Sequence, residues 1–170
     1  MAVTDPRDET VLMDAGMFIG ALLQGDPRHA EARPVVEHAR QGTVPACTTT
    51  GILSEVYGAL TWEHAVPRHT PAEAAAAVRL LVEPPSALAV LEEGVAVALR
   101  MLALGAHHQL TARRIHDARH AATALVHGIR AVYTYDIGDW QDFEADGLRI
   151  VGPPTTMTRL AQHAHRPSGR

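Results

Sequence analysis

Acidic residues at positions where a charge is costly are the feature of this sequence that most suggests chemistry. Asp14 ends a short apolar run, Glu55 and Asp117 lie on otherwise apolar predicted helices, and Asp136 and Asp139 follow another apolar run. An ionised carboxylate in an apolar setting is tolerated only where it is paired or binds a metal, and no basic residue lies within a few positions of Asp14 or Glu55. If these carboxylates converge, they form an oxygen-rich site of the kind that Mg²⁺ or Mn²⁺ prefers.

Each of these acids also has a structural explanation when it is taken alone. Asp14 can cap the helix that it precedes, Glu55 can be a solvated helical side chain, and Asp117 can pack beside small alanines. Asp136 and Asp139 fall in a strand-to-loop turn, where acids are common. Their joint occurrence near matching ends of predicted strands is what favours a shared site.

The elements that must position these acids alternate between strands and helices. Short apolar runs between turn residues predict strands at 10–14, 43–48, 87–91, 129–134 and 147–151. Helical spacing and capping residues predict helices at 15–24, 29–41, 50–60, 70–82, 92–104, 111–128 and, briefly, 155–163. This order predicts an α/β fold of three layers, α/β/α, around a mostly parallel sheet of four to five strands. Sites in such sheets lie beyond the carboxyl ends of the strands, which all of the acids can reach.

Length and composition narrow the possible classes of protein. The 170 residues favour one domain, predicted at 1–153, with a tail at 154–170 that forms a short helix and then a disordered end. The net charge of −4 gives no global attraction to nucleic acid. All fifteen basic residues are arginine, which excludes a P-loop lysine, a Schiff-base lysine and the lysine of a phospho-receiver domain.

Cysteine usage and hydropathy predict a cytoplasmic protein. The single cysteine, Cys47, excludes an internal disulfide and a cysteine-based zinc cluster, and it fits a reducing compartment. The first twenty residues lack a basic segment followed by an apolar run, so no signal peptide is expected. No apolar stretch approaches the ~18 residues that a membrane span needs.

The acidic motifs taken together resemble the PIN domain, with the order and spacing of its VapC-type toxins. The segments that carry the resemblance are Leu12–Asp14, Gly51–Val56, His116–Ala124, Val132–Trp140 and Gly147–Val151. The resemblance covers about residues 10–153. It implies a metal-dependent endoribonuclease, the toxin of a type II toxin–antitoxin pair of the VapBC type, with one or two Mg²⁺ or Mn²⁺ ions as cofactor.

The resemblance also implies the residues of the site. Asp14, Glu55, Asp117 and the acid after Thr134 would bind the metal. The last motif of the family usually ends in Asp-Phe and here reads Asp139-Trp140, while Asp136 is also an acid at a family position. Both Asp136 and Asp139 are therefore candidate ligands.

Thr134 and three arginines are candidates to support this site. Thr134 is expected either to hold a carboxylate through its hydroxyl or to be an ordinary strand-end threonine. Arg119, with Arg113 and Arg114, either contacts RNA phosphates or forms a solvated face. Bound metal would polarise a phosphodiester and supply hydroxide at neutral pH, and the resemblance implies products with 5′-phosphate and 3′-hydroxyl ends.

The resemblance implies partners as well as a substrate. RNA would be the substrate, and a small antitoxin would hold the toxin by laying a segment in an apolar groove, often with an arginine directed at the acids. Candidate walls of that groove are Met17–Leu23, Val35–Ala39 and Leu80–Val82. A homodimer is expected, and no membrane partner.

Several other functions remain open at this point. His116 and His120 have the spacing of a zinc-binding helix, although eleven histidines make chance pairs common and both are expected to flank Asp117, facing solvent or substrate. The chain could be a PIN nuclease of RNA processing, or one acting on DNA, outside a toxin–antitoxin pair. It could also be a non-catalytic PIN-like interaction protein, although its filled acidic positions speak against this.

Overall fold

The computed structural model of the protein describes residues 9–164. The disordered end expected at His165–Arg170 and the start of the chain, residues 1–8, lie outside the described residues. The strands are β1 (Val11–Met13), β2 (Ala46–Thr49), β3 (Ala89–Leu91), β4 (Ala131–Tyr133) and β5 (Arg149–Gly152). The helices are α1 (Ala15–Leu22), α2 (His29–Arg40), α3 (Thr50–Thr61), α4 (Pro71–Val82), α5 (Val95–His107), α6 (Arg114–Val126), α7 (Ile137–Gln141), the 3-10 helix η2 (Asp142–Asp146) and α8 (Pro154–Ala164).

The five strands form one parallel sheet in the order β3-β2-β1-β4-β5, which confirms the predicted α/β class. The chain builds outward from β1 to β2 and β3, then returns to the other side of β1 to add β4 and β5. The strand order therefore reverses between β1 and β4, and such switch points open a crevice at the carboxyl ends of the strands. Asp14 follows β1 directly at this point.

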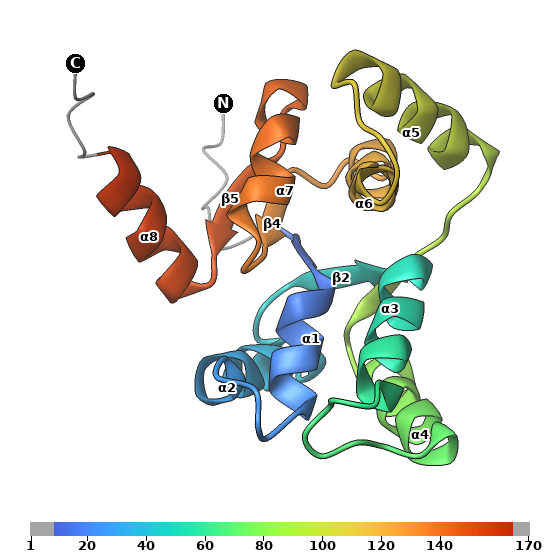
Figure 1. Cartoon of the computed structure of the whole chain (residues 1–170), viewed down its shortest axis with the longest axis vertical. Helices are drawn as coiled ribbons and strands as arrows, with labels where there is room; N and C mark the ends of the chain where they lie inside the picture. Colours follow the sequence, from blue (N-terminus) through green and yellow to red (C-terminus); the bar gives the residue numbers. More distant parts are fainter. Residues whose placement is uncertain (1–8, 165–170) are drawn as a thin grey trace.

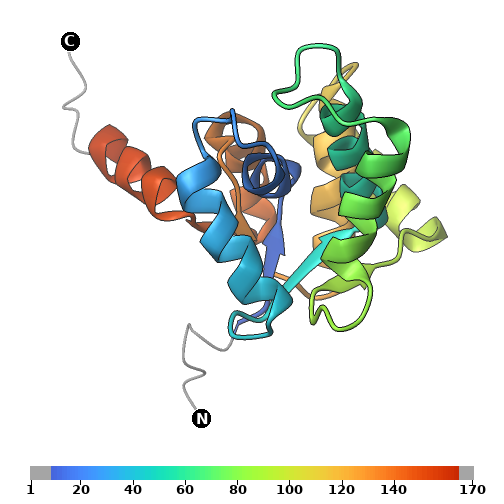
Figure 2. The same cartoon turned by 90° about the horizontal axis from the view of Figure 1, so that it is seen from below.

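Helices cover both faces of the sheet and enclose a continuous apolar core. Figure 2 shows α2 and α8 on one side of β1, with α3, α4 and α6 grouped on the other. In Figure 1, α5 runs beside α6, and α8 lies outermost beside β5. The largest fully buried side chains include Leu12 on β1, Phe18 on α1 and Phe143 on η2. In the part of the chain that the structure describes, no helix is both long and apolar enough to cross a bilayer.

Capping residues place the helix starts as the sequence predicts. The Thr49 hydroxyl accepts a hydrogen bond from the amide of Ile52 and begins α3. Thr70 and Glu73 form a reciprocal capping box around Pro71 at the start of α4. Each of these contacts satisfies amides that would otherwise lack a partner at a helix end. The Thr49 cap fixes the start of α3, the helix that carries Glu55.

Two helices begin three residues later than predicted, and two short helices, α7 and η2, were missed. The helix expected at 111–128 begins at Arg114, because Ala112 has a φ of +48°, a left-handed conformation that a helix cannot include. The helix expected at 92–104 begins only after Gly94. The segment after β4, expected as a loop, contains α7, which Asp136 caps by accepting a hydrogen bond from the amide of Asp139 (3.3 Å).

An irregularity between β4 and β5 sets the direction of the chain as it leaves the sheet. Val132 pairs with Ile150, but Tyr133 pairs with Gly152, so the register shifts by one residue. A Cβ on Gly152 would lie 2.6 Å from the Tyr133 ring, so only glycine fits there. The Thr134 amide then donates to the Gly152 carbonyl, and the Thr156 hydroxyl of α8 donates to the Thr134 carbonyl (2.7 Å). Hydrogen bonds from its amide and to its carbonyl thus fix the backbone of Thr134. The domain boundary predicted at residue 153 stays a prediction.

The central strand should dominate stability. Leu12 is fully buried on β1, whereas Leu80 on α4 is 63% exposed. We expect Leu12→Ala to lower the free energy of unfolding by about 3 kcal/mol, because it removes buried methyl groups and leaves a cavity. Leu80→Ala, the matched control, should change it by no more than about 0.5 kcal/mol. Chemical denaturation followed by circular dichroism measures both, and equal effects of the two variants would contradict the placement of β1 at the centre of the core.

Candidate functional site

One cavity at the carboxyl ends of the strands brings the predicted acids together. It has a volume of about 380 Å³. Its walls come from β1, α1, α3, α6, α7 and the loop before α2, and its lining residues are Asp14, Ala15, Gly16, Arg28, Glu55, Asp117, Tyr135, Asp136, Asp139 and Trp140. All five acids singled out in the sequence therefore line this cavity, which we call the acid cavity.

Asp14 is the most restrained of the five carboxylates. Its Oδ1 accepts from the amide of Ala15 (2.8 Å), so Asp14 does cap α1 as its structural explanation predicts. Its Oδ2 accepts from the Thr134 hydroxyl (2.7 Å) and the Trp140 indole N–H (3.1 Å). Burial raises the pKa of Asp14, and these three donors, with the charge of His120, oppose that rise only in part. The carboxylate is thus held in one orientation without a cation to neutralise it.

Trp140 is a site residue that the sequence showed only as a departure from the family motif. It is 2% exposed and packs edge-on against Phe143, with the ring centroids 6.3 Å apart. Phenylalanine at this position would fill much of the same space but has no donor for Asp14. Tryptophan in place of phenylalanine therefore adds a hydrogen bond to Asp14, the carboxylate at the switch point of the sheet.

Asp117 and Asp139 repel each other across the cavity. Burial and the charges of Asp139 and Asp14 raise the pKa of Asp117 to about 7, although His120 and Arg114 act in the opposite direction. Burial, with the hydrogen bond and charge of Asp136, raises the pKa of Asp139, and Asp14 adds to this. Burial favours the protonated form of these carboxylates, and a bound cation would relieve the part of the shift that comes from like charges.

Asp136 and Asp139 occupy different positions in the cavity wall. Asp136 is exposed and receives the amide of Asp139 as the cap of α7, while its own amide donates to the Thr134 hydroxyl (2.9 Å). Asp139 is half-buried and interacts electrostatically with both Asp117 and Asp14. Asp139 is therefore the acid that faces the other carboxylates.

Glu55 is bound to a buried histidine. His120 is 2% exposed; its Nε2 lies 2.6 Å from Glu55 Oε1, and its Nδ1 lies 3.1 Å from the Thr49 hydroxyl. Burial raises the pKa of Glu55, but His120, Arg119 and His116 lower it by more, so its net pKa lies below the ordinary value. The expectation that His120 faces solvent or substrate is wrong, because helix α6 turns this position into the core. His116 is exposed as expected, whereas both ring nitrogens of His120 already contact protein groups, Glu55 and Thr49.

Glu93 is a further buried acid that the sequence did not single out. Its side chain is 15% exposed, accepts from the Thr50 hydroxyl (3.0 Å) and lies 3.4 Å from Arg119 Nε. It also lies 3.9 Å from His120 Nδ1. Glu93 sits in the loop between β3 and α5, and no local pattern distinguishes it from a solvated acid. Its contacts fix Arg119 and His120 from behind, away from the acid cavity.

A second, wider cavity adjoins the first and is rich in arginine. Its volume is about 790 Å³, and its lining residues are Ser54, Glu55, Arg113, Arg114, His116, Asp117, Arg119 and Asp139. Arg119 lies directly over Gly51, where any side chain would collide with its guanidinium. Arg114 Nη2 lies 2.8 Å from Asp142, and its Nε lies 3.8 Å from Asp139. The arginine cavity thus shares three acids with the acid cavity and continues it toward solvent.

Comparison with known proteins identifies the family. The family model of the PIN domain matches residues 11–143. The chain belongs to the PIN-domain family. No curated protein sequence matches the chain.

Solved structures of VapC toxins have the same fold as this PIN domain. VapC20 of Mycobacterium tuberculosis, described as a toxin that cleaves the sarcin–ricin loop, superposes with a TM-score of 0.63 and 21% identity over 84% of this chain and 99% of that one. VapBC of Salmonella typhimurium bound to DNA gives a TM-score of 0.59 and 18% identity, over 84% of this chain and 97% of that one. VapBC2 of Rickettsia felis, bound to a DNA fragment from its promoter, gives a TM-score of 0.58 and 9% identity, over 84% of this chain and 97% of that one. At these identities the likeness establishes the fold.

The residues of the acid cavity fit a divalent ion that keeps part of its water. The donors that line it are hard carboxylate oxygens, and Cys47 is buried elsewhere in the core. Within residues 9–164, no three histidine, cysteine, aspartate or glutamate side chains lie close enough to hold an ion directly. Mg²⁺ commonly binds through one or two carboxylates and retains several waters, so the cavity of this PIN domain suits a hydrated ion rather than a closed cage. The assignment of the five acids as ligands stays a prediction.

The raised pKa of Asp117 predicts a pH-dependent cost to stability. The unfolded state has the ordinary pKa of 3.8 and the folded state one of about 7, so between these values the unfolded chain binds fewer protons and stability falls as pH rises. Asp117→Asn removes this cost. We expect its melting temperature to exceed that of the wild type at about pH 8, with a gain that shrinks toward about pH 5.

Differential scanning calorimetry without divalent ions measures this effect. Glu144→Gln is the matched control, because it removes an exposed carboxylate outside the cavity. The control should show no gain that depends on pH. A lower melting temperature for Asp117→Asn at both pH values would show that Asp117 is not under repulsion.

Proposed function

We propose that this PIN domain is a metal-dependent endoribonuclease and the toxin of a VapBC-type toxin–antitoxin pair. The observation that carries the proposal is the acid cavity, where five carboxylates from separate elements meet at the switch point of the sheet. Such a concentration of acids is costly without a cation, and structural capping accounts for only two of them. The nuclease activity of the family and the toxin nature of the structural neighbours support the same conclusion.

We propose that Asp14, Asp117 and Asp139 hold the ion, one or two of them directly and the rest through its water, with Asp136 and Glu55 in supporting positions. Asp136 orients Asp139 through the start of α7, and His120 holds Glu55 at the cavity wall. One or two Mg²⁺ or Mn²⁺ ions, when bound, polarise the scissile phosphodiester and lower the pKa of the attacking water. The carboxylates are then ligands and not nucleophiles.

The chain's own cations are proposed to draw the RNA backbone to a protein whose net charge is −4. Arg113, Arg114 and Arg119 line the arginine cavity beside the acids, and guanidinium groups suit phosphate oxygens in geometry and charge. Arg119 is held by Glu93 and Arg114 by Asp142, so both are ordered before RNA arrives. Contacts of this kind position a backbone and do not read its sequence.

The proposed antitoxin partner rests on the VapBC complexes among the structural neighbours. Most of the side chains predicted to line its groove are buried in the core instead, among them Phe18, Val36 and Leu81. The segments do meet at a surface cavity of about 290 Å³, but charged Arg33 and Glu37 contribute to its walls. The antitoxin segment is therefore expected to be amphipathic and not wholly apolar. Homodimerisation stays a prediction.

Induced expression in a bacterial host tests the function. We expect the wild type to arrest growth and to leave new RNA 5′-phosphate ends, found by sequencing of RNA ends. Asp14→Asn should do neither, because it removes a charge from the centre of the acid cavity. Coexpression of a small gene found immediately upstream should restore growth.

Glu63→Gln is the matched control for this experiment. Glu63 is exposed and does not line the acid cavity, so this variant should arrest growth like the wild type. Equal toxicity of the wild type and Asp14→Asn would contradict the metal-site proposal. RNA cleavage without growth arrest would favour a PIN nuclease of RNA processing.

Metal affinity should depend on the donors that hold Asp14. Thr134→Val and Trp140→Phe each remove one hydrogen bond to Asp14 Oδ2, and loss of such an orienting contact weakens metal binding by about tenfold. Titration calorimetry with Mn²⁺ measures the affinity directly. Thr123→Val is the control, since Thr123 is also buried and hydrogen-bonded but does not line the cavity. Unchanged Mn²⁺ affinity in both test variants would separate Asp14 from metal binding.

A further inference from the structure

Arg28 lines the acid cavity, but it comes from the start of α2 and not from α6. It precedes α2, and its guanidinium is held by Asp26 through two parallel bonds, from Nε to Oδ1 (2.8 Å) and from Nη2 to Oδ2 (2.6 Å). The Arg28 amide donates to the same carboxylate (2.8 Å). This fork arrangement fixes both the plane and the direction of the guanidinium.

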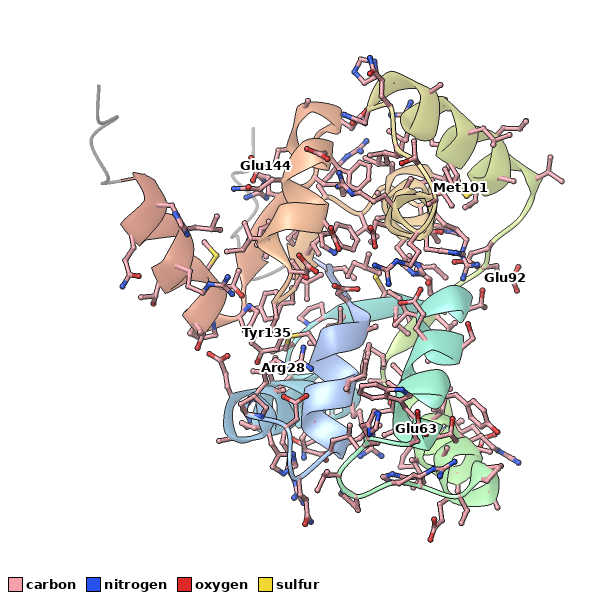
Figure 3. All side chains as sticks on the ribbon, viewed as in Figure 1. Arg28, Glu63, Glu92, Met101, Tyr135 and Glu144 are labelled. Atoms are coloured by element: carbon pink, nitrogen blue, oxygen red, sulfur yellow. The ribbon has the colours of Figure 1, made fainter. Side chains whose placement is uncertain are left out.

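An aromatic ring supports the guanidinium from one side. Arg28 Cζ lies 5.3 Å from the centre of the Tyr135 ring, within the range of a cation–π contact. The Tyr135 hydroxyl donates to Glu31 (2.9 Å), and Glu31 also accepts from the amide and hydroxyl of Thr155. Figure 3 labels Arg28 and Tyr135 side by side. The ring is thus anchored from α2 and α8, and Arg28 rests against a rigid surface.

Arg28 lines the acid cavity and has donors that Asp26 does not use. A guanidinium carries five N–H donors; Asp26 takes one from Nε and one from Nη2, which leaves both donors of Nη1 and one of Nη2. A Cβ on Gly16, the second residue after Asp14, would lie only 2.9 Å from Arg28 Nη1. Glycine here lets the guanidinium lie against the start of α1, at the wall of the cavity that Asp14 also lines.

The ion pair of Arg28 is with Asp26 and not with any of the five acids, although the charge of Asp14 contributes to the raised pKa of Arg28. None of the hydrogen bonds or ion pairs among the described residues joins it to Asp14, Glu55, Asp117, Asp136 or Asp139. Two of its five donors are bound to Asp26, which is outside the set. The side chain is one-third exposed, so its free edge is open to a ligand that enters the cavity. A fixed end of a guanidinium, with paired donors in one plane, suits two oxygens of a phosphate.

We propose that Arg28 binds a backbone phosphate of the substrate RNA next to the scissile one, on the side of the acid cavity away from the arginine cavity. The inference rests on the proposed nuclease function and deepens it. The RNA backbone then spans the acids, with one phosphate held at Arg28 and others at the α6 arginines. Asp26 and Tyr135 position Arg28, and the phosphate takes the free edge.

Binding of a labelled RNA tests this role apart from catalysis. The probe is a short fluorescein-labelled single-stranded RNA of mixed sequence, followed by anisotropy at several salt concentrations with Ca²⁺ in place of Mg²⁺. Arg28→Ala should weaken binding about tenfold, the loss expected for charge-assisted hydrogen bonds. Its slope of log affinity against log salt should fall by about 0.7, the loss of one phosphate contact on a single strand.

Arg33→Ala is the matched control, because Arg33 is an exposed arginine on α2, five residues after Arg28 and outside the acid cavity. It should keep the wild-type affinity and slope. Arg28→Lys serves if Arg28→Ala unfolds; it keeps the charge and the slope but should lose affinity, since lysine cannot serve Asp26 and a phosphate together.

The outcomes separate this inference from the function on which it rests. Wild-type binding with no loss in the Arg28 variants, or equal losses in Arg28→Ala and Arg33→Ala, overturns the role of Arg28 and leaves the nuclease proposal standing. Tighter binding by Arg28→Ala would show that Arg28 blocks the cavity and also overturns it. Failure of the wild type to bind RNA, together with no heat of Mn²⁺ binding, overturns both proposals.

Discussion

A buried carboxylate at the end of the central strand is the constraint on which the rest of this PIN domain depends. Asp14 follows β1 where the strand order reverses, and its two oxygens accept three hydrogen bonds. The donors come from α1, from the end of β4 and from α7. The register shift of β4 against β5, the glycine beneath Tyr133 and the cap of α7 all serve to bring those donors to one point. Much of the irregular structure in the second half of the chain therefore places hydrogen-bond donors around Asp14.

The sequence predicted the parts of this arrangement that depend on local pattern. Short apolar runs set the five strands, and caps such as Thr70 set helix starts, because hydrophobic period and capping chemistry act over a few residues. The five acids could be predicted as site residues because each lies near the end of a predicted strand. Helix α7 escaped prediction because five residues are too few to show a helical period, and the start of α6 was misplaced because nothing in the sequence marks Ala112 for a positive φ.

The residues that sequence reasoning missed are those whose importance is set by distant contacts. His120 reaches Glu55 across 65 positions, and Trp140 reaches Asp14 across 126. His120 looked like one of eleven histidines, and Trp140 like a conservative aromatic replacement. Arg28 lies between the helices predicted at 15–24 and 29–41, where the sequence indicated only a turn. In each case the residue type was visible, but the partner was not, since chain topology alone brings the two together.

The arrangement of charge around the acid cavity follows from a conflict between two requirements. Cations must lie near the acids if RNA is to approach, yet an arginine that pairs with those acids would occupy the place of a metal ion. Each of three arginines here is bound by a carboxylate outside the five: Arg28 by Asp26, Arg114 by Asp142 and Arg119 by Glu93. Of the three, only Arg114 also approaches one of the five acids, with its Nε 3.8 Å from Asp139, and its closer contact is the 2.8 Å one to Asp142. Burial and the negative charges of Asp139 and Asp14 together raise the pKa of Asp117 to about 7, and the divalent ion that we propose would relieve the repulsion among these acids.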